Sequence, residues 1–437
     1  MRRYLYCLAL SIASLSCANA QSFAFFRVEG PPAVPGGPGV QANNGTAQPS
    51  LSLDGRTLVF RVGSGSNLTG GASGAQVLAL SLSSGEIALV STTAGGAASA
   101  SSTTNDAPVA SADGRFVAFE TTSSTYTGGV TGVHVVRIDR STRAAALVNV
   151  TAGGGLPAGT SSRLGGISGD GRFVVFTSNA AGLVAGDPGL STNAVFVRDV
   201  VAGTTQRIDV TPSGGPGNGG AFGERPTISR DGRFVAFASS AGNLLGTPLS
   251  GSQRIYVRDR QAGTTVQASV GPGGADLSGA GNPAISPDGS LVVFGSGGSG
   301  AAATQLWVRR LAQPAAVAVP AAVGMGICDS ARISDAALVI AQCRRNGGLP
   351  AQAYLWSLAQ PASPPELISG SDAGNTVPGN GVAGARVAIS ADARVFAFDA
   401  DASDLVVGDS NNATDSFVYA EASIVDTLFA DGFEPTQ

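Results

Sequence analysis

The sequence predicts an all-β protein, a seven-bladed β-propeller made of four-stranded antiparallel blades. Two observations predict it: one short motif recurs along the chain, and the strand that ends each copy is apolar on both faces. The motif is clearest at residues 228–237, ISRDGRFVAF. Its copies lie 59, 57, 61, 57, 47 and 57 residues apart, a period typical of repeat architectures. Each copy is marked by one aspartate: Asp54, Asp113, Asp170, Asp231, Asp288, Asp335 and Asp392.

Each repeat predicts four strands in an antiparallel meander. In the fourth repeat a short strand ends at Ile228, and the Asp-Gly pair of the motif makes a tight turn. The second strand is residues 234–237, the third 254–259 and the fourth 265–270. The glycine of the turn supplies the positive φ that such a reversal requires. Four strands of this kind make one blade.

The second strand of the repeats is apolar at both alternating positions. Residues 116–119 are FVAF, residues 173–176 are FVVF and residues 234–237 are FVAF. A sandwich would leave one face of each sheet in water and would show alternation instead. Sheets that are covered on both faces and repeated every 40 to 60 residues or so are the blades of a propeller.

The two ends of the repeat array predict how the ring closes. Residues 26–31 resemble the last strand of the third repeat at 206–212, so residues 22–29 are a fourth strand without its first three. This N-terminal strand would pair beside residues 416–420 of the seventh repeat and remove two free sheet edges. The alternative makes residues 424–429 the last strand and the N-terminal segment a loose arm. The first interpretation is favoured.

The chain is expected to divide into a signal peptide at 1–20, a single propeller domain at 21–425 and a short tail at 426–437. The signal has a basic start at Arg2 and Arg3, an apolar run, and a small-residue Ala-Asn-Ala cleavage site. The apolar run is shorter than the roughly 20 residues that a membrane span needs. We therefore expect a periplasmic or secreted protein.

A lipid anchor on Cys17 is the less favoured alternative, because Ser14 stands where a leucine is usual in lipoprotein signals. No other stretch is long and apolar enough to predict a membrane span.

Composition limits the class of partner. The 437 residues are 43% hydrophobic and 13% charged with a net charge of -4, and all 26 basic residues are arginine. No basic run is present, which argues against a nucleic-acid partner and against attachment to a membrane surface by charge. A globular monomer is expected.

Two of the four cysteines lie in the predicted signal, which leaves Cys328 and Cys343. A hairpin around residues 334–337 would put Ile333 opposite Leu338, and the same register puts the two cysteines opposite each other. We predict that they form a disulfide in an oxidising compartment. A zinc site is not expected, because zinc prefers four ligands and His134 is the only histidine.

No catalytic constellation stands out. His134 lies in a third strand, where a packed or rim histidine is the favoured interpretation, and no Gly-x-Ser-x-Gly elbow occurs. The motif aspartates precede glycine in every repeat except the sixth and seventh. We interpret them as turn residues rather than catalytic groups. No cofactor is expected.

The sharpest local pattern is the loop at residues 408–415. Asp409, Asn411 and Asp415 place oxygen ligands at alternating positions, which suits calcium. The loop lacks the distal glutamate of a calcium-binding helical hand. A loop held by its own side chains is therefore the favoured interpretation, with a calcium site as the alternative.

The motif of residues 228–237, together with Ile-Tyr-Val-Arg-Asp-Arg-x-x-Gly-Thr-Thr at 255–265, resembles the TolB-like β-propeller repeat family, which is related in architecture to WD-repeat propellers. The resemblance covers nearly the whole mature chain. It is specific in repeats two to five and seven, and weaker in the first and in the sixth, where Asp335 is followed by alanines. It implies a propeller and export. The additional N-terminal domain of TolB is not expected here.

The leading hypothesis is an exported, non-catalytic propeller that binds an envelope or extracellular protein or glycan with its loops or central funnel. The alternative is a hydrolase or lyase that acts on polysaccharide with acidic residues in the funnel. Three or more Asp, Glu or Arg side chains meeting near the axis would favour the enzyme. A funnel of alanine, glycine and serine would exclude it.

Overall fold

The computed structural model describes residues 23–29, 41–99, 108–157, 160–185, 192–221, 225–249, 251–297, 305–321, 325–345, 347–360, 363–371, 377–406, 409, 411, 413–421 and 423–424. The predicted signal peptide with Cys17, and the tail at 426–437, lie outside these residues. No helix among them is long and apolar enough to cross a membrane.

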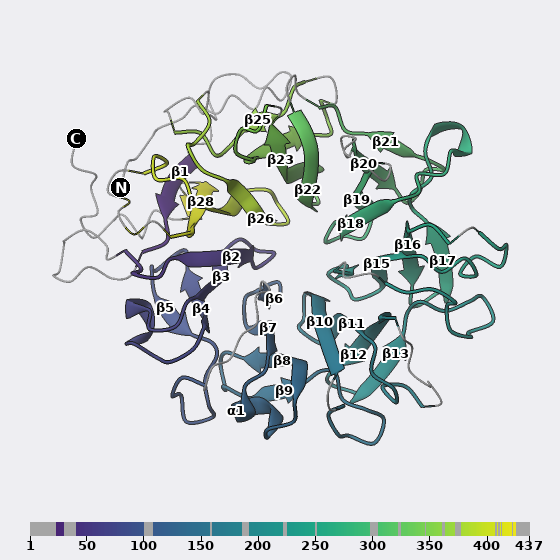
Figure 1. Cartoon of the computed structure of the whole chain (residues 1–437), viewed down its shortest axis with the longest axis horizontal. Coiled ribbons are helices and arrows are strands. Elements are labelled where there is room, and N and C mark those ends of the chain that lie inside the picture. The colour runs from purple at the N-terminus through teal and green to yellow at the C-terminus, as the bar shows by residue number, and fades with distance from the viewer. Residues whose placement is uncertain are drawn as a thin grey trace.

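The described strands form six sheets, all built from antiparallel meanders and arranged around a common centre (Figure 1). In four of these sheets the strands follow one another in chain order. They are β2 (Thr46–Leu51), β3 (Thr57–Val62), β4 (Gln76–Ser81) and β5 (Ile87–Leu89); β14 (Thr227–Ile228), β15 (Phe234–Ser239), β16 (Arg254–Asp259) and β17 (Thr264–Gln267); β18 (Ala280–Ile285), β19 (Leu291–Ser296), β20 (Gln305–Arg310) and β21 (Ala316–Ala318); and β22 (Met325–Ile333), β23 (Leu338–Arg345), β24 (Gln352–Ser357) and β25 (Glu366–Leu367).

One eight-stranded sheet contains two further meanders. They are β6 (Val109–Ala110), β7 (Phe116–Thr121), β8 (Gly132–Asp139) and β9 (Ala145–Leu147), and β10 (Thr160–Ile167), β11 (Phe173–Ser178), β12 (Ala194–Asp199) and β13 (Thr204–Arg207). A short parallel pairing between β8 and β10 joins them. The helical elements are short: η1 (Asn67–Thr69), α1 (Ser124–Thr127) and η2 (Pro272–Gly274).

The last sheet combines the two ends of the described chain. Its order is β1 (Phe23–Arg27), β28 (Asp415–Glu421), β27 (Val395–Ala400) and β26 (Ala383–Ile389). β1 runs antiparallel to β28, with Phe23 opposite Glu421 and Arg27 opposite Phe417. The C-terminal repeat therefore provides three strands of this sheet, and the N-terminal strand β1 provides the fourth, outermost one.

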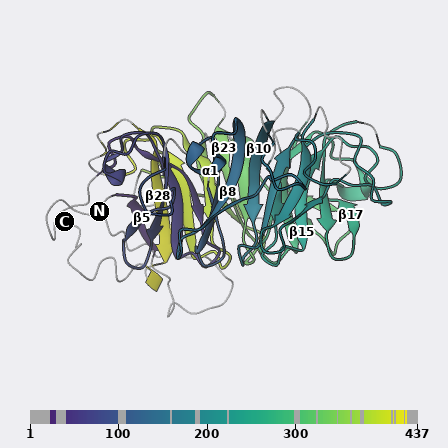
Figure 2. The ribbon, with the colours of Figure 1, turned by 90° about the horizontal axis from the view of Figure 1, so that it is seen from below.

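The first strand of each meander lies nearest the centre. β2, β6, β10, β14, β18, β22 and β26 each contact the first strand of the next meander, and β26 contacts β2. Seen from the side, the strands run through the thickness of a flat body (Figure 2). We call these seven strands the inner strands.

The core lies between neighbouring meanders, as the apolar second strands predict. In β15, Val235 and Phe237 pack against residues of β11 and β12, while Ala236 and Ala238 pack toward β19. Successive side chains of a strand point to opposite faces, so both faces of this sheet are covered. The aromatic residue that closes the motif is fully buried in most repeats: Phe60, Phe119, Phe176, Phe237, Phe294 and Phe398.

The motif aspartates hold the turn between the first and second strands. Ser229 Oγ donates to Asp231 Oδ1, which also accepts the N–H of Arg233 at 2.9 Å. The same Oγ accepts the N–H of Phe234 at 3.0 Å, and Gly232 has a φ of 72°. The serine and aspartate are bonded in the same way in five other repeats: Ser52 and Asp54, Ser111 and Asp113, Ser168 and Asp170, Ser286 and Asp288, and Ser390 and Asp392.

The turn of the sixth repeat differs from the one that the sequence predicts around Asp335. Ser334 Oγ accepts the N–H of Leu338, four residues on, whereas Ser229 bonds five residues on. The turn is one residue shorter, with Ala337 at a φ of 56°. Asp335 therefore stands where Arg230 stands in the fourth repeat, and it is not the counterpart of the other motif aspartates.

Hydrogen bonds link these turns from one meander to the next. The residue after the motif serine donates its N–H to the carbonyl of its counterpart: Ala112 to Gly169, Gly169 to Arg230, Arg230 to Pro287, Asp335 to Ala391 and Ala391 to Leu53. In the first repeat, Asp54 is the donor, to Ala112. Pro287 has no N–H, and there Asp288 donates instead to Asp335 Oδ1 at 2.7 Å.

Cys328 and Cys343 form a disulfide between β22 and β23. The predicted register is right at the cysteines and wrong at the hairpin, because Ile333 pairs with Val339 rather than with Leu338. β22 has two register shifts, and the one between Asp329 and Arg332 offsets this slip by one residue.

Candidate functional site

One position of the second strand changes in charge and size from repeat to repeat: the residue after the buried aromatic, or after Ala341 in the sixth repeat. This position is occupied in turn by Arg61, Glu120, Thr177, Ala238, Gly295, Gln342 and Asp399. The motif before it is nearly constant, so a charge at this position is a signal of specialisation. We did not single these residues out from sequence, although repeats one, two and seven carry that signal.

The inner strands are interrupted by β-bulges at similar places. Register shifts occur in β2, β10, β18, β22 and β26. Gln48, Asn282 and Ser330 have positive φ at these shifts, at 59°, 52° and 51°. A bulge leaves backbone groups unpaired and changes the direction of nearby side chains. The inner strands therefore need polar partners close to the centre of the molecule.

Buried acids supply those partners. Glu120 Oε1 accepts the N–H of Leu164 on β10 at 2.8 Å. Asp399 Oδ1 accepts the N–H of Arg386 at 2.7 Å, and its Oδ2 accepts the N–H of Gln48 at 3.4 Å. Burial raises the pKa of Asp399, while these two hydrogen bonds oppose the rise. Both carboxylates are held by backbone groups of inner strands.

Three partly buried arginines lie near these acids. Arg332 is on β22, Arg386 is on β26, and Arg225 is two residues before β14. The pKa of Arg332 is lowered to about 10, mainly by burial and to a smaller extent by the positive charges of Arg386 and Arg225. Arg225 and Arg386 are therefore each close enough to Arg332 to repel its charge. We call Arg225, Arg332 and Arg386 the axial arginines.

Two of the axial arginines each contact an oxygen atom of a nearby residue. Arg332 Nη1 donates to the carbonyl of Ala331 at 2.8 Å, and Arg225 Nη2 lies 3.8 Å from Glu120 Oε1. Arginine presents several donors in a plane and pairs well with carboxylates and phosphates. Such a cluster can bind an anionic group, and it meets the condition that three or more charged side chains gather near the axis.

Two of the predicted calcium ligands face cationic and amide donors. Arg27 Nη1 lies 3.5 Å from Asp409 Oδ1 and 3.7 Å from Asp415 Oδ2. Gln41 Nε2 donates to the same two oxygens at 2.8 and 3.1 Å. Burial raises the pKa of Asp415, while Gln41 and Arg27 lower it. The two carboxylates thus already have a positive partner.

The third predicted ligand is engaged locally. Asn411 Oδ1 accepts the N–H of Ala413 at 2.9 Å, and its Nδ2 donates to the carbonyl of Ala42 at 2.7 Å. In the part of the chain that the structure describes, no group of three or more His, Cys, Asp or Glu is placed to hold a metal ion. The donor set fits a side-chain-stabilised loop better than a calcium site.

His134 is fully buried on β8 and belongs to a polar network. Its Nδ1 lies 3.0 Å from Asn149 Nδ2, which also donates to Ser162 Oγ at 3.0 Å. Ser162 in turn donates to Ser178 Oγ. Burial lowers the pKa of His134. This is a packed histidine, as the sequence predicts, and it is not placed for proton transfer to a ligand.

Comparison with known proteins shows the fold. No protein-family model and no curated protein sequence matches this chain. An oligogalacturonate lyase from Vibrio parahaemolyticus is 11% identical, with a TM-score of 0.53 over 92% of this chain and 97% of its own. The β-propeller domain of the trilobed protease from Pyrococcus furiosus is also 11% identical, with a TM-score of 0.52 over 89% and 98%. The chain is therefore a β-propeller.

A TolB from Acinetobacter baumannii is 16% identical with a TM-score of 0.37, over 61% of this chain. The chain spans about half, 52%, of the length of that TolB. The propeller fold that the sequence resemblance implied thus rests on the two fuller matches.

Proposed function

We propose that this protein is an exported, non-catalytic propeller scaffold that binds an anionic protein or glycan in the cell envelope or outside the cell. The axial arginines carry the proposal. The charges of Arg225 and Arg386 both act against that of Arg332, and a bound anion would offset this repulsion. Since the whole chain has a net charge of -4, this positive centre is local.

The nearby acids support binding rather than catalysis. A general acid or base must reach the reacting group and change its protonation state. Glu120 and Asp399 are almost fully buried, and their oxygens accept backbone N–H groups. Their hydrogen bonds stabilise the bulges of the inner strands, and this structural role accounts for Glu120 and Asp399 without a catalytic one.

An enzyme acting on acidic polysaccharide is the second candidate. The charged side chains near the axis favour it, and so does the contact of Arg225 with Glu120 at 3.8 Å. One solved structure with this fold is named an oligogalacturonate lyase. An arginine beside a carboxylate could orient a uronate-type substrate, but the two acids near the axis, Glu120 and Asp399, are buried and bound to backbone N–H groups.

The architecture proposed for this function is a ring of seven blades, closed by the N-terminal strand, in a single monomeric domain at 21–425. The pairing of β1 with β28 supports the closure, as do the hydrogen bonds that link the turns from Leu53 round to Ala391. A signal peptide at 1–20 fits the disulfide of Cys328 and Cys343, which suits an oxidising compartment.

Binding of defined polymers by the mature protein tests the proposal. We expect it to bind polygalacturonate or an acidic envelope component, more weakly as salt rises, and not to bind an uncharged glucan. Arg332→Gln with Arg386→Gln should weaken binding by about tenfold or more. Arg344→Gln is the matched control, because Arg344 is an exposed arginine of β23 outside the cluster.

Three outcomes separate the candidates. Binding without product release supports the scaffold. Release of shortened chains from the same polymer, abolished by the double variant, supports the enzyme. Binding that the double variant leaves unchanged removes the axial arginines from either function.

A further inference from the structure

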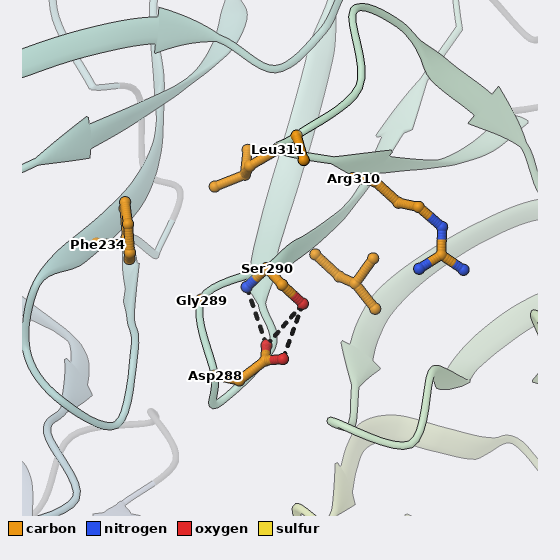
Figure 3. A pocket seen from close by; sticks show the side chains of 8 residues that line it. Phe234, Asp288, Gly289, Ser290, Arg310 and Leu311 are labelled. Carbon is orange, nitrogen blue, oxygen red and sulfur yellow. Dashed lines mark hydrogen bonds between the residues drawn. The ribbon is translucent and has the colours of Figure 1, made fainter.

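A pocket of about 400 Å³ lies between the fourth and fifth repeats, and none of the axial arginines lines it. Phe234 lines it on one side and Arg310 on another, with Gly289 and Leu311 also in its wall (Figure 3). Asp288 and Ser290 are joined by hydrogen bonds at its edge. The fifth repeat departs from the fourth at three positions that line this pocket, Ser290, Arg310 and Leu311.

In the second and third repeats, two guanidinium groups stack on the phenylalanine equivalent to Phe234. Phe116 lies under its own Arg115, at 4.8 Å, and under Arg137, at 4.4 Å. Phe173 lies under its own Arg172, at 4.9 Å, and under Arg260, at 4.4 Å. The second arginine is attracted by the face of the ring.

The second arginine also binds a fixed acceptor, the carbonyl of the turn glycine in the next repeat. Arg137 Nη1 donates to Gly171 O at 2.8 Å, and Arg260 Nη1 donates to Gly232 O at 2.5 Å. The phenylalanine ring and the turn glycine are in contact in each case, since a Cβ added to either glycine would lie under 2.5 Å from the ring. We call the ring face and this carbonyl the guanidinium seat.

The third such seat is built but not filled from within the described chain. Phe234 has its own Arg233 at 4.7 Å, and a Cβ added to Gly289 would lie 2.6 Å from the ring. Among the described residues no second arginine stacks on Phe234, and no hydrogen-bond donor reaches Gly289 O. The seat has the same ring and the same glycine as the other two.

Two positions can supply the second arginine, and both are apolar here. One is the strand position of Arg137, which is occupied by Val257 in the sheet of Phe234, as the strand pairings show. The other is the position of Arg260, which is occupied by Leu311: both donate a backbone N–H to the residue after the turn glycine. Arg137 fills the seat at Phe116 from the first position, and Arg260 fills the seat at Phe173 from the second.

A second substitution adds an unmatched charge beside the seat. In the fourth repeat Arg233 pairs with Asp259 at 2.6 Å. In the fifth repeat Ser290 replaces the arginine, and Arg310 replaces the aspartate, opposite Leu291. Arg310 is exposed, and its side chain has no ion pair with any described residue. A ligand carboxylate beside Arg310 would restore an arginine–carboxylate pair at this place.

The geometry points to a docking site for an arginine side chain of a partner protein, seated between Phe234 and the Gly289 carbonyl, with an acidic neighbour that meets Arg310. The site shares no residue with the axial arginines. The net charge of -4 favours a partner segment that brings a cation.

Ligand-observed NMR on the full mature protein tests the site, with N-acetyl-arginine amide as the probe and N-acetyl-citrulline amide as its uncharged analogue. We expect saturable binding of the arginine probe that is roughly tenfold stronger than that of citrulline. Leu311→Arg fills the seat from within, as Arg260 does at Phe173, and should abolish binding while the protein stays folded. Phe234→Leu removes the ring and should also abolish it.

Val201→Arg is the control, since it adds an arginine at an exposed position elsewhere. Binding that Leu311→Arg leaves intact, equal binding of citrulline, or no saturable binding overturns the proposal. Arg310→Ala tests whether Arg310 itself occupies the guanidinium seat in solution. Stronger binding of the arginine probe by this variant would mean that it does, and would also overturn the proposal. A variant that binds polygalacturonate more weakly but binds the arginine probe as before reports on the axial arginines alone.

Discussion

Asp335 accepts the backbone N–H of Asp288 at 2.7 Å, where the preceding residue is a proline with no N–H to donate. Elsewhere the turns of successive repeats are linked mostly through the N–H of the residue after the motif serine. A carboxylate from the next repeat has taken over the link at the one turn where this donor is missing. Asp335 also pairs with Arg230 Nη2 at 2.6 Å, so it holds three consecutive turns together.

We predict that Asp335→Ala lowers the free energy of unfolding by about 1–2 kcal/mol, because one hydrogen bond and one partly exposed ion pair are lost. In that background, Pro287→Ala should recover part of the loss, since it restores an N–H at the usual position. Urea unfolding of the three variants measures both effects. If Pro287→Ala is equally harmful with and without Asp335, the proposed replacement of one donor by another is wrong.

Arg27 ties the first strand to the last repeat. Its side chain is 5% exposed and lies beside Glu29, Asp409 and Asp415. Removing one partner of a buried charge group leaves the others uncompensated, which costs about 3–5 kcal/mol. Arg27→Ala should therefore destabilise the fold by an amount of this order in thermal or urea unfolding.

The same variant tests the calcium alternative. With Arg27 in place, we expect no change in melting temperature between calcium and a chelator, whereas Arg27→Ala frees Asp409 and Asp415 for a cation and should gain a calcium-dependent rise. Arg207→Ala is the matched control, because Arg207 makes a similar pair with Asp209. A calcium response in the unaltered protein would revive the loop as a metal site.

His134 should make stability depend on pH. Burial lowers its pKa below the ordinary value of about 6.5, so the unfolded chain takes up the proton first as pH falls. Its contribution is fully present above pH 6.5 or so and is lost progressively below it, at up to about 1.4 kcal/mol per pH unit. Unfolding measured at pH 7.5, 6.5 and 5.5 should show this slope. His134→Gln should flatten it, and a slope that persists in this variant assigns the effect to other groups.

The axial arginines should cost stability when no ligand is bound. Because Arg332 is desolvated and repelled by Arg225 and Arg386, Arg332→Gln is expected to raise the free energy of unfolding by about 1 kcal/mol. The same change should weaken binding of the anionic ligand. A rise in the free energy of unfolding together with weaker ligand binding would identify Arg332 as a binding residue. A fall in both stability and binding would mean that Arg332 is structural. Arg344→Gln again serves as the control and should change neither.

Local patterns were sufficient to predict the fold. The repeat period and the apolar second strands report which faces of a strand are buried, and this information is carried by neighbouring residues. Residues 234–237 are a clear example, since alternate side chains enter the two neighbouring cores. The pairing of Cys328 with Cys343 was also accessible, although a bulge between Asp329 and Arg332 that no sequence rule revealed sets the register between them.

The candidate sites depend on contacts between residues far apart in the chain. Arg225, Arg332 and Arg386 come from three different repeats and meet only because the inner strands surround one centre. Asp335 looked like a motif aspartate until a turn one residue shorter changed its partners. The sequence alone thus determined that the chain folds as repeated, doubly covered sheets, because burial periodicity is local. Only the tertiary structure decided which charges and aromatic rings share a site, because that depends on how the repeats are placed around the ring.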